Sequence, residues 1–254
     1  MSGAVLIVAL GFVLGMRHAT DADHVVAVTT IVTRQRGLRQ ALLTGLMWGA
    51  GHSLTVTAVG SAIVLFNLTI PPRVGVAMEV AVGAMLVLLG LLNMAAFRDF
   101  LTFRRRRLTA TDYGHVHAHG DYVHEHPHPE PVSHPHDPDR TPMTILDHRL
   151  GRWQLYSLLR PIVVGIVHGL AGSAAVTLMV VAVVREPGWA VAYLLVFGLG
   201  TMTGMVVVTL SLASAIRLVG ASSARVTRGL GFVTGFASVL FGLTYAYQSL
   251  FTSF

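Results

Sequence analysis

The 254-residue sequence contains no cysteine and no lysine, and charged residues make up only 12% of it. The absence of cysteine excludes disulfides, thiolate metal sites and covalent haem attachment. A soluble domain carries about 25% charged residues. The low charge, the 53% hydrophobic content and the mean hydropathy of +0.65 therefore exclude an ordinary soluble domain. This composition is typical of a polytopic membrane protein, whose partner is the lipid bilayer.

Six apolar stretches are long enough to cross a bilayer, which requires roughly 20 helical residues. Backbone groups find no partners in lipid, and no closed-barrel alternation is present, so we expect these spans to be α-helices. The net charge of +6 does not indicate a nucleic-acid partner, because the arginines lie between the apolar stretches. The expected spans are 4–32, 40–67, 74–97, 160–184, 188–216 and 228–251.

The arginines are distributed unequally among the loops. Of the 18 arginines, 15 fall in the first, third and fifth loops and two in the other loops, while Arg17 remains inside the first span. The positive-inside rule then places the odd-numbered loops in the cytoplasm and both termini outside. We expect a multi-pass protein of the cytoplasmic (inner) membrane, with the first span retained because no basic segment precedes it.

The two halves of the chain resemble each other at offsets of 149 to 152 residues. The matching positions are Gly15 and His18 with Gly165 and His168, Trp48-Gly-Ala-Gly51 with Phe197-Gly-Leu-Gly200, and Gly83 and Gly90 with Gly235 and Gly242. Small residues that allow close helix packing are the alternative explanation. A repeat of three spans inverts its second copy, an architecture common in secondary transporters.

The predicted fold is therefore all-α, a polytopic membrane protein with six transmembrane helices arranged as two inverted three-helix repeats. Three units follow from this prediction. They are a first membrane repeat at 1–107, a disordered His-rich cytoplasmic loop at 108–150, and a second membrane repeat at 151–254.

Ionisable side chains are concentrated inside the first span. Charged groups at the centre of a membrane cost about 2.5–3.5 kcal/mol each on insertion scales, so they must pair or bind something. Imidazole suits divalent nickel, cobalt, copper and zinc, while carboxylates add negative charge. The candidate metal ligands are His18, Asp21, Asp23, His24 and His52. We expect Arg17 to neutralise one of the two aspartates.

A regular helix cannot direct this whole set at one ion, because His18 and His24 differ by 120° around the axis at 100° per residue. We therefore expect the first helix to be interrupted within 15–24. His168, Ser53 and Glu79 are secondary candidates; a structural hydrogen-bonding role is the alternative for each, as it is for Thr201.

The segment 108–150 is rich in histidine and proline and shows no periodic apolar face. Such a composition favours disorder, and histidine-rich tracts bind metal weakly. We expect the segment to buffer or meter ions at the cytoplasmic mouth. A polar linker between the two halves is the alternative.

The run from Arg17 to His24 resembles the signature of the nickel/cobalt transporter family, whose core His-x4-Asp-His is matched by His18, Asp23 and His24. Gly51-His52-Ser53 is similar to the second motif of that family. Many members have eight spans and a second acidic motif that is absent here, so the chain is nearest to the shorter six-span permeases found with urease genes. The resemblance implies a metal site in the first two helices.

The leading hypothesis is a secondary transporter, not an enzyme, that takes up Ni²⁺ and also Co²⁺, with the ion as cargo and no resident cofactor. No phosphate-binding Gly-x4-Gly-Lys loop is present to bind ATP. Cytoplasmic metallochaperones are candidate partners. Efflux by the same fold is the alternative. A bis-histidine haem carrier using His18, His52 or His168 is disfavoured because haem needs no adjacent carboxylates, and a metalloprotease because His-Glu-x-x-His is absent.

Overall fold

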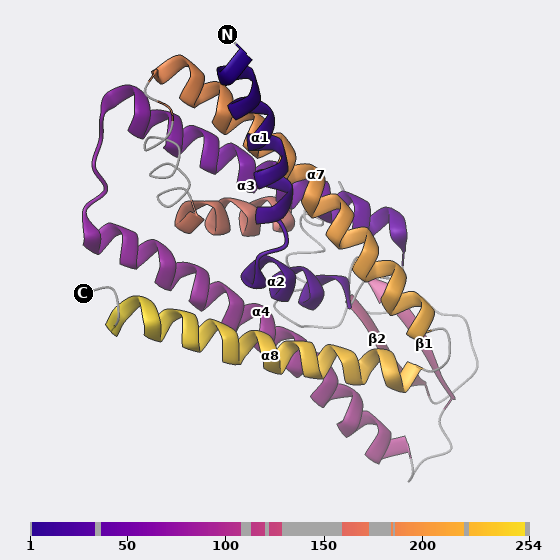
Figure 1. Ribbon diagram of the computed structural model, residues 1–254. Coiled ribbons are helices and arrows are strands. Elements are labelled where there is room, and N and C mark those ends of the chain that lie inside the picture. The colour runs from indigo at the N-terminus through magenta and orange to yellow at the C-terminus, as the bar shows by residue number, and fades with distance from the viewer. Residues whose placement is uncertain are drawn as a thin grey trace.

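Apart from two strands, the computed structural model is helical (Figure 1). It describes residues 2–33, 37–107, 113–119, 122–128, 159–172, 184, 186–220 and 224–251. The helices are α1 (Ser2–His18), α2 (Ala22–Val32), α3 (Leu38–Phe66), α4 (Pro72–Arg107), an unlabelled helix at Leu159–Gly172, α7 (Pro187–Gly220) and α8 (Ala224–Phe251). The strands are β1 (Tyr113–His119) and β2 (Tyr122–His128).

Four of the described helices are long and apolar enough to cross a membrane. They are α3, the part Pro72–Met94 of α4, the part Pro187–Leu218 of α7 and the part Gly229–Phe251 of α8. The helices of the first and fourth expected spans are shorter, and residues 173–183 of the fourth lie outside the described residues. The polytopic all-α class is confirmed, whereas the count of six spans stays a prediction.

The first expected span is interrupted, as predicted. Helix α1 ends at His18 and α2 begins at Ala22. The Thr20 hydroxyl donates to the carbonyl of Arg17 at 2.6 Å, and Asp21 has an extended backbone with φ −61° and ψ 149°. A side-chain bond of this kind competes with the helical ladder. The interruption is thus confined to the three residues between the helices.

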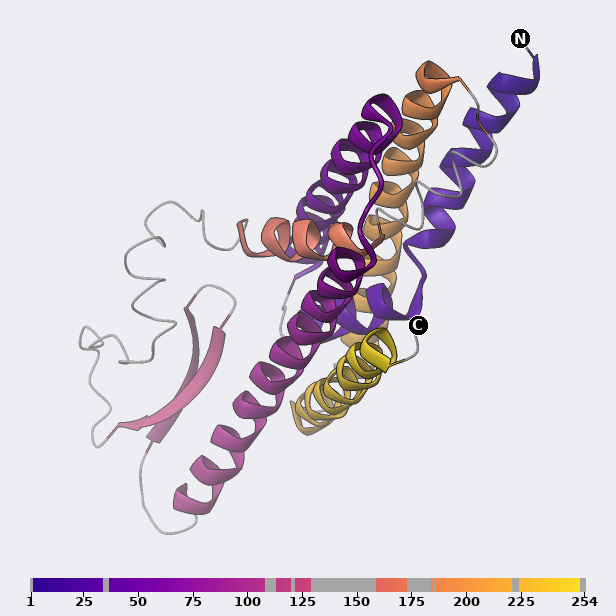
Figure 2. The same ribbon diagram turned by 90° about the vertical axis from the view of Figure 1, so that its left-hand side faces the viewer.

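The helices of the two halves pack in pairs. Helix α3 runs along α7, α1 also packs on α7, and α4 runs along α8 (Figures 1 and 2). These contacts depend on glycine, because association of helices in lipid relies on close backbone approach. The broken end of α1 lies against Gly204, whose missing side chain leaves room for Ala19.

The backbone contacts around α1, α3 and α7 occur twice, in matching positions of the two halves. Gly15 lies against the carbonyl of Phe197, and its counterpart Gly165 lies against the carbonyl of Trp48. A two-fold axis relating the halves requires such a reciprocal pattern, because it exchanges both partners of each contact.

The pairing of α4 with α8 follows the same reciprocal pattern. Gly83 lies against the carbonyl of Gly242, and Gly235 lies against the carbonyl of Gly90. In the repeat, Gly83 matches Gly235 and Gly90 matches Gly242. Exchanging the two halves therefore turns the first contact into the second. These contacts support the inverted repeat.

A β-hairpin occurs inside the segment for which the sequence predicts disorder. Its antiparallel register places His115 opposite His126 and His117 opposite His124. In Figure 2 the two strands lie beyond the bundled helices. Histidine alternates with Val116 and Ala118, which is a strand pattern, although the prolines of the segment disfavour a strand. The rest of 108–150 lies outside the described residues, so the three-unit division stays a prediction.

The close approach of α4 and α8 gives a test of the packing. A methyl group on Gly90 would lie 2.5 Å from the carbonyl oxygen of Gly235. We expect Gly90→Ala to destabilise the folded protein by about 1–3 kcal/mol, the usual effect of overpacking. Gly75→Ala on the same helix is the control, since nothing lies within 4 Å of that position. Circular dichroism measures the melting temperature of each variant in detergent. Equal melting temperatures for the two variants would contradict this packing.

Candidate metal centre

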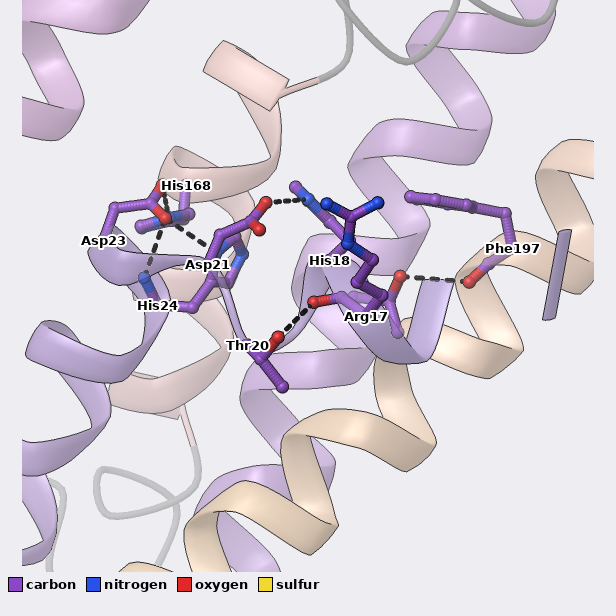
Figure 3. A network of polar contacts seen from close by, with 9 residues as sticks. Arg17, His18, Thr20, Asp21, Asp23, His24, His168 and Phe197 are labelled. Carbon is purple, nitrogen blue, oxygen red and sulfur yellow. Dashed lines mark hydrogen bonds and ion pairs between the residues drawn. The ribbon is translucent and has the colours of Figure 1, made fainter. Parts of the chain in front are cut away.

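The break between α1 and α2 places the first histidine–aspartate pair. His18 is the last residue of α1, and Asp21 lies just before α2. The Nδ1 atom of His18 donates to Oδ2 of Asp21 at 2.7 Å (Figure 3). An ionised carboxylate only accepts hydrogen bonds, so Nδ1 carries a proton, and in the neutral form of the ring the Nε2 atom of His18 has a free lone pair.

Asp23 binds two histidines from different halves of the chain. Its Oδ1 atom accepts from Nδ1 of His24 at 3.0 Å, and its Oδ2 atom accepts from Nε2 of His168 at 2.8 Å (Figure 3). Oδ1 also accepts from the backbone amide of His24 at 2.9 Å. The carboxylate therefore fixes the tautomer of both rings and joins α2 to the helix Leu159–Gly172.

Four imidazole rings gather at this point. The ring of His24 lies 4.7 Å from that of His18, 5.0 Å from that of His52 and 4.2 Å from that of His168, between ring centroids. The side chains of His24, His52 and His168 are buried, with 1%, 0% and 2% exposure. Such dense burial of imidazole is hard to explain by packing alone, because buried polar atoms require partners.

Several of these nitrogens have no partner. The unpartnered buried atoms are Nε2 of His18, Nε2 of His24, both ring nitrogens of His52 and Nδ1 of His168. His18, His24 and His52 offer ligand atoms that all lie within 4.8 Å of one another, and Asp23, His24 and His168 form a second such group. Three neighbouring imidazoles of this kind are suited to a metal ion.

The charges of the cluster are suited to a divalent cation. Asp21 and Asp23 each accept a hydrogen bond from an imidazole of the cluster, and when ionised the two carboxylates carry two negative charges. The expected neutralisation of an aspartate by Arg17 is wrong within the described residues, where both carboxylates pair with histidines instead. The reason is geometric, since the helix break turns the carboxylates toward the rings.

Of the three secondary candidates, only His168 lies in the cluster. His168, from the second half, joins the cluster through Asp23. The Ser53 hydroxyl donates to the carbonyl of Gly198 at 2.7 Å, which is the structural role left open above. Glu79 is half-buried on α4 and belongs to neither group of neighbouring ligand atoms.

Two aromatic residues beside the cluster were not singled out from the sequence. The ring of Phe197 lies 5.5 Å from that of His18, and the ring of Trp48 lies 5.8 Å from that of His168. A signal for them was present, because these two aromatic residues occupy matching positions of the repeat.

Comparison with known proteins identifies the family of the chain. Residues 4–141, more than half of the chain, match the NicO family, described as high-affinity nickel-transport protein. The chain therefore belongs to this family of transporters and is not an enzyme. It is also 31% identical over 242 residues to the urease accessory protein UreH of Bacillus sp. (strain TB-90), covering 95% of this chain and 91% of that protein. No solved structure matches the chain.

The hydrogen bonds behind the rings give a graded prediction for metal binding. Replacing an orienting carboxylate usually lowers metal affinity about 10–100-fold, so we expect Asp21→Asn to weaken Ni²⁺ binding to this extent. His52→Ala removes a ligand and should weaken binding further. Glu79→Gln should bind as the unmodified protein does. Isothermal titration of monodisperse protein in detergent measures all three, and unchanged affinity in His52→Ala would refute the site.

Proposed function

We propose that the protein takes up Ni²⁺ across the cytoplasmic membrane and that His18, His24 and His52 hold the ion partway. One observation supports this most strongly: each of these rings carries a buried nitrogen without a partner, and each offers a ligand atom within 4.8 Å of those of the other two. Leaving a buried polar atom unpaired costs about 1–3 kcal/mol. An ion that binds these atoms removes that penalty and gains ligands in place of its hydration water.

Asp21 and Asp23 act in this proposal as orienting and charge-balancing groups. Each accepts the Nδ1 proton of a neighbouring histidine, and this arrangement directs the Nε2 lone pair toward the ion and makes it more basic. Asp23 additionally ties the site to His168. We infer that the second half reaches the ion through this carboxylate, so that movement between the halves changes the coordination.

The membrane potential is a sufficient energy source for uptake. Each charge gains about 2.3 kcal/mol per 100 mV on moving inward, so a doubly charged ion gains about twice that amount. Imidazole ligands also suit Co²⁺, which precedes Ni²⁺ in the usual order of affinity. We therefore propose Co²⁺ as a second, more weakly bound cargo.

The arginine-rich loops are assigned to the cytoplasm and both termini to the outside. On this assignment the His-rich hairpin lies at the cytoplasmic mouth, where its two opposed histidine pairs are suited to collecting the ion. Cytoplasmic metallochaperones are then the partners that would receive it.

The proposed role of the hairpin is tested by deleting residues 113–138. Because the deletion removes the opposed histidines and leaves the described helices intact, we expect a changed sensitivity of cells to nickel with uptake preserved. Complete loss of uptake in a folded deletion variant would contradict a metering role.

The site itself is tested by uptake of radioactive nickel into cells. We expect His18→Ala to abolish uptake because it removes a ligand, and Asp23→Ala because it releases both His24 and His168. Glu79→Gln, on α4 and outside the cluster, is the control that should retain uptake. Normal uptake by both alanine variants at equal expression would exclude this site.

Efflux through the same site remains the second candidate, favoured by the histidines on the arginine-rich side of the chain. Overexpression separates the two directions. Uptake predicts higher nickel content in cells, whereas efflux predicts resistance to nickel and a lower content.

A further inference from the structure

Two aromatic side chains border the histidine cluster. The ring of Phe197 on α7 packs on that of His18, and the indole of Trp48 on α3 packs on the rings of His168 and His24, at 5.8 and 6.3 Å. Both are buried, with 5% exposure for Phe197 and 0% for Trp48. Neither side chain has an atom that can act as a ligand for a divalent ion, because phenylalanine has no polar atom and the indole nitrogen only donates.

These two contacts are copies of each other. Phe197 matches Trp48 in the repeat, and His18 matches His168. Each aromatic ring therefore packs on the histidine of the opposite half, and the backbone contacts beneath them are reciprocal as well. Equivalent residues of an inverted repeat lie on opposite sides of the membrane midplane.

The packing of α3 on α7 places the two rings at different levels. The helices are antiparallel, with Gly49 beside Met202 and the Ser53 hydroxyl bonded to the Gly198 carbonyl. Phe197 is thus level with the residue after Ser53, six residues beyond Trp48, which is roughly 9 Å along a helix. His52 lies between the two levels.

We propose that Phe197 and Trp48 close the two ends of the ion's path through the membrane, one ring for each side. This inference rests on the proposed function. An apolar ring across a narrow path excludes water and hydrated ions, and the ion reaches the histidines only when one ring turns aside. Opening one ring at a time gives access from one side at a time.

The surroundings of each ring favour such motion. The indole Nε1–H of Trp48 is buried without an acceptor, so its closed position is not stabilised by a hydrogen bond and the ring can turn at a lower energetic cost. Phe197 is supported by Tyr193, whose ring stacks on it at 6.3 Å and 17°. That stacking holds the closed position without fixing it by a polar contact.

The two rings are assigned to sides through the direction of the helices. Helix α7 runs parallel to α1, because Gly11 lies beside Tyr193 and Gly15 beside Phe197. With the N-terminus outside, Phe197 closes the outer end and Trp48 the cytoplasmic end.

The test uses a single reporter cysteine, which the cysteine-free chain makes possible. Thr201 is fully buried on α7, and its hydroxyl donates to the Phe197 carbonyl at 3.0 Å. Its level lies between those of the two rings. Thr201→Cys is labelled with a membrane-impermeant cationic thiol reagent in right-side-out and inside-out vesicles, without nickel.

We expect Thr201→Cys alone to react slowly from both sides. Adding Phe197→Ala should make labelling severalfold faster from the outside only, and adding Trp48→Ala should do so from the cytoplasmic side only. Phe236→Ala, which removes an exposed ring of α8, is the control and should change neither rate. Trp48→Val replaces Trp48→Ala if the latter is not monodisperse.

Acceleration from the same side by both variants, or from neither side, would overturn the proposal. Because labelling requires no nickel, the result is independent of the metal assignment. A different combination is that the two variants accelerate labelling from opposite sides while the histidine variants still take up nickel normally. That combination would support the two rings as closures and reject the ion site.

Discussion

The arrangement depends on one constraint: imidazole nitrogens buried inside a helical bundle must find partners. Two aspartates provide partners for one nitrogen each of His18, His24 and His168, and they leave the others without any. A purely structural network would satisfy both nitrogens of a ring. We propose that the partner of the unsatisfied set is one that arrives and leaves, as a transported ion does.

The fold provides this geometry through a short interruption and close backbone contacts. Ending α1 at His18 and starting α2 at Ala22 allows side chains within seven residues of sequence to meet, which no continuous helix permits. Glycines at matching positions of the two halves let α1 and the helix Leu159–Gly172 approach α7 and α3. The second half then contributes His168 to the cluster.

Much of this was predictable from the sequence, because the signals were local. Four of the expected spans, the interruption of the first helix and the clustering of His18, Asp23 and His24 follow from hydropathy and from the cost of charge in a membrane. The partners of the carboxylates did not follow, because Arg17 and the histidines compete for them and only the turn at Thr20 decides. The pairing of Asp23 with His168, 145 residues apart, depends on tertiary packing alone.

The central claim is that a divalent ion occupies the point shared by His18, His24 and His52. Anomalous diffraction at the nickel absorption edge, from crystals grown with Ni²⁺, tests it directly. The account predicts a peak at bonding distance from Nε2 of His18, Nε2 of His24 and one nitrogen of His52. Nickel located only elsewhere in the protein, with these rings still unligated, would contradict it.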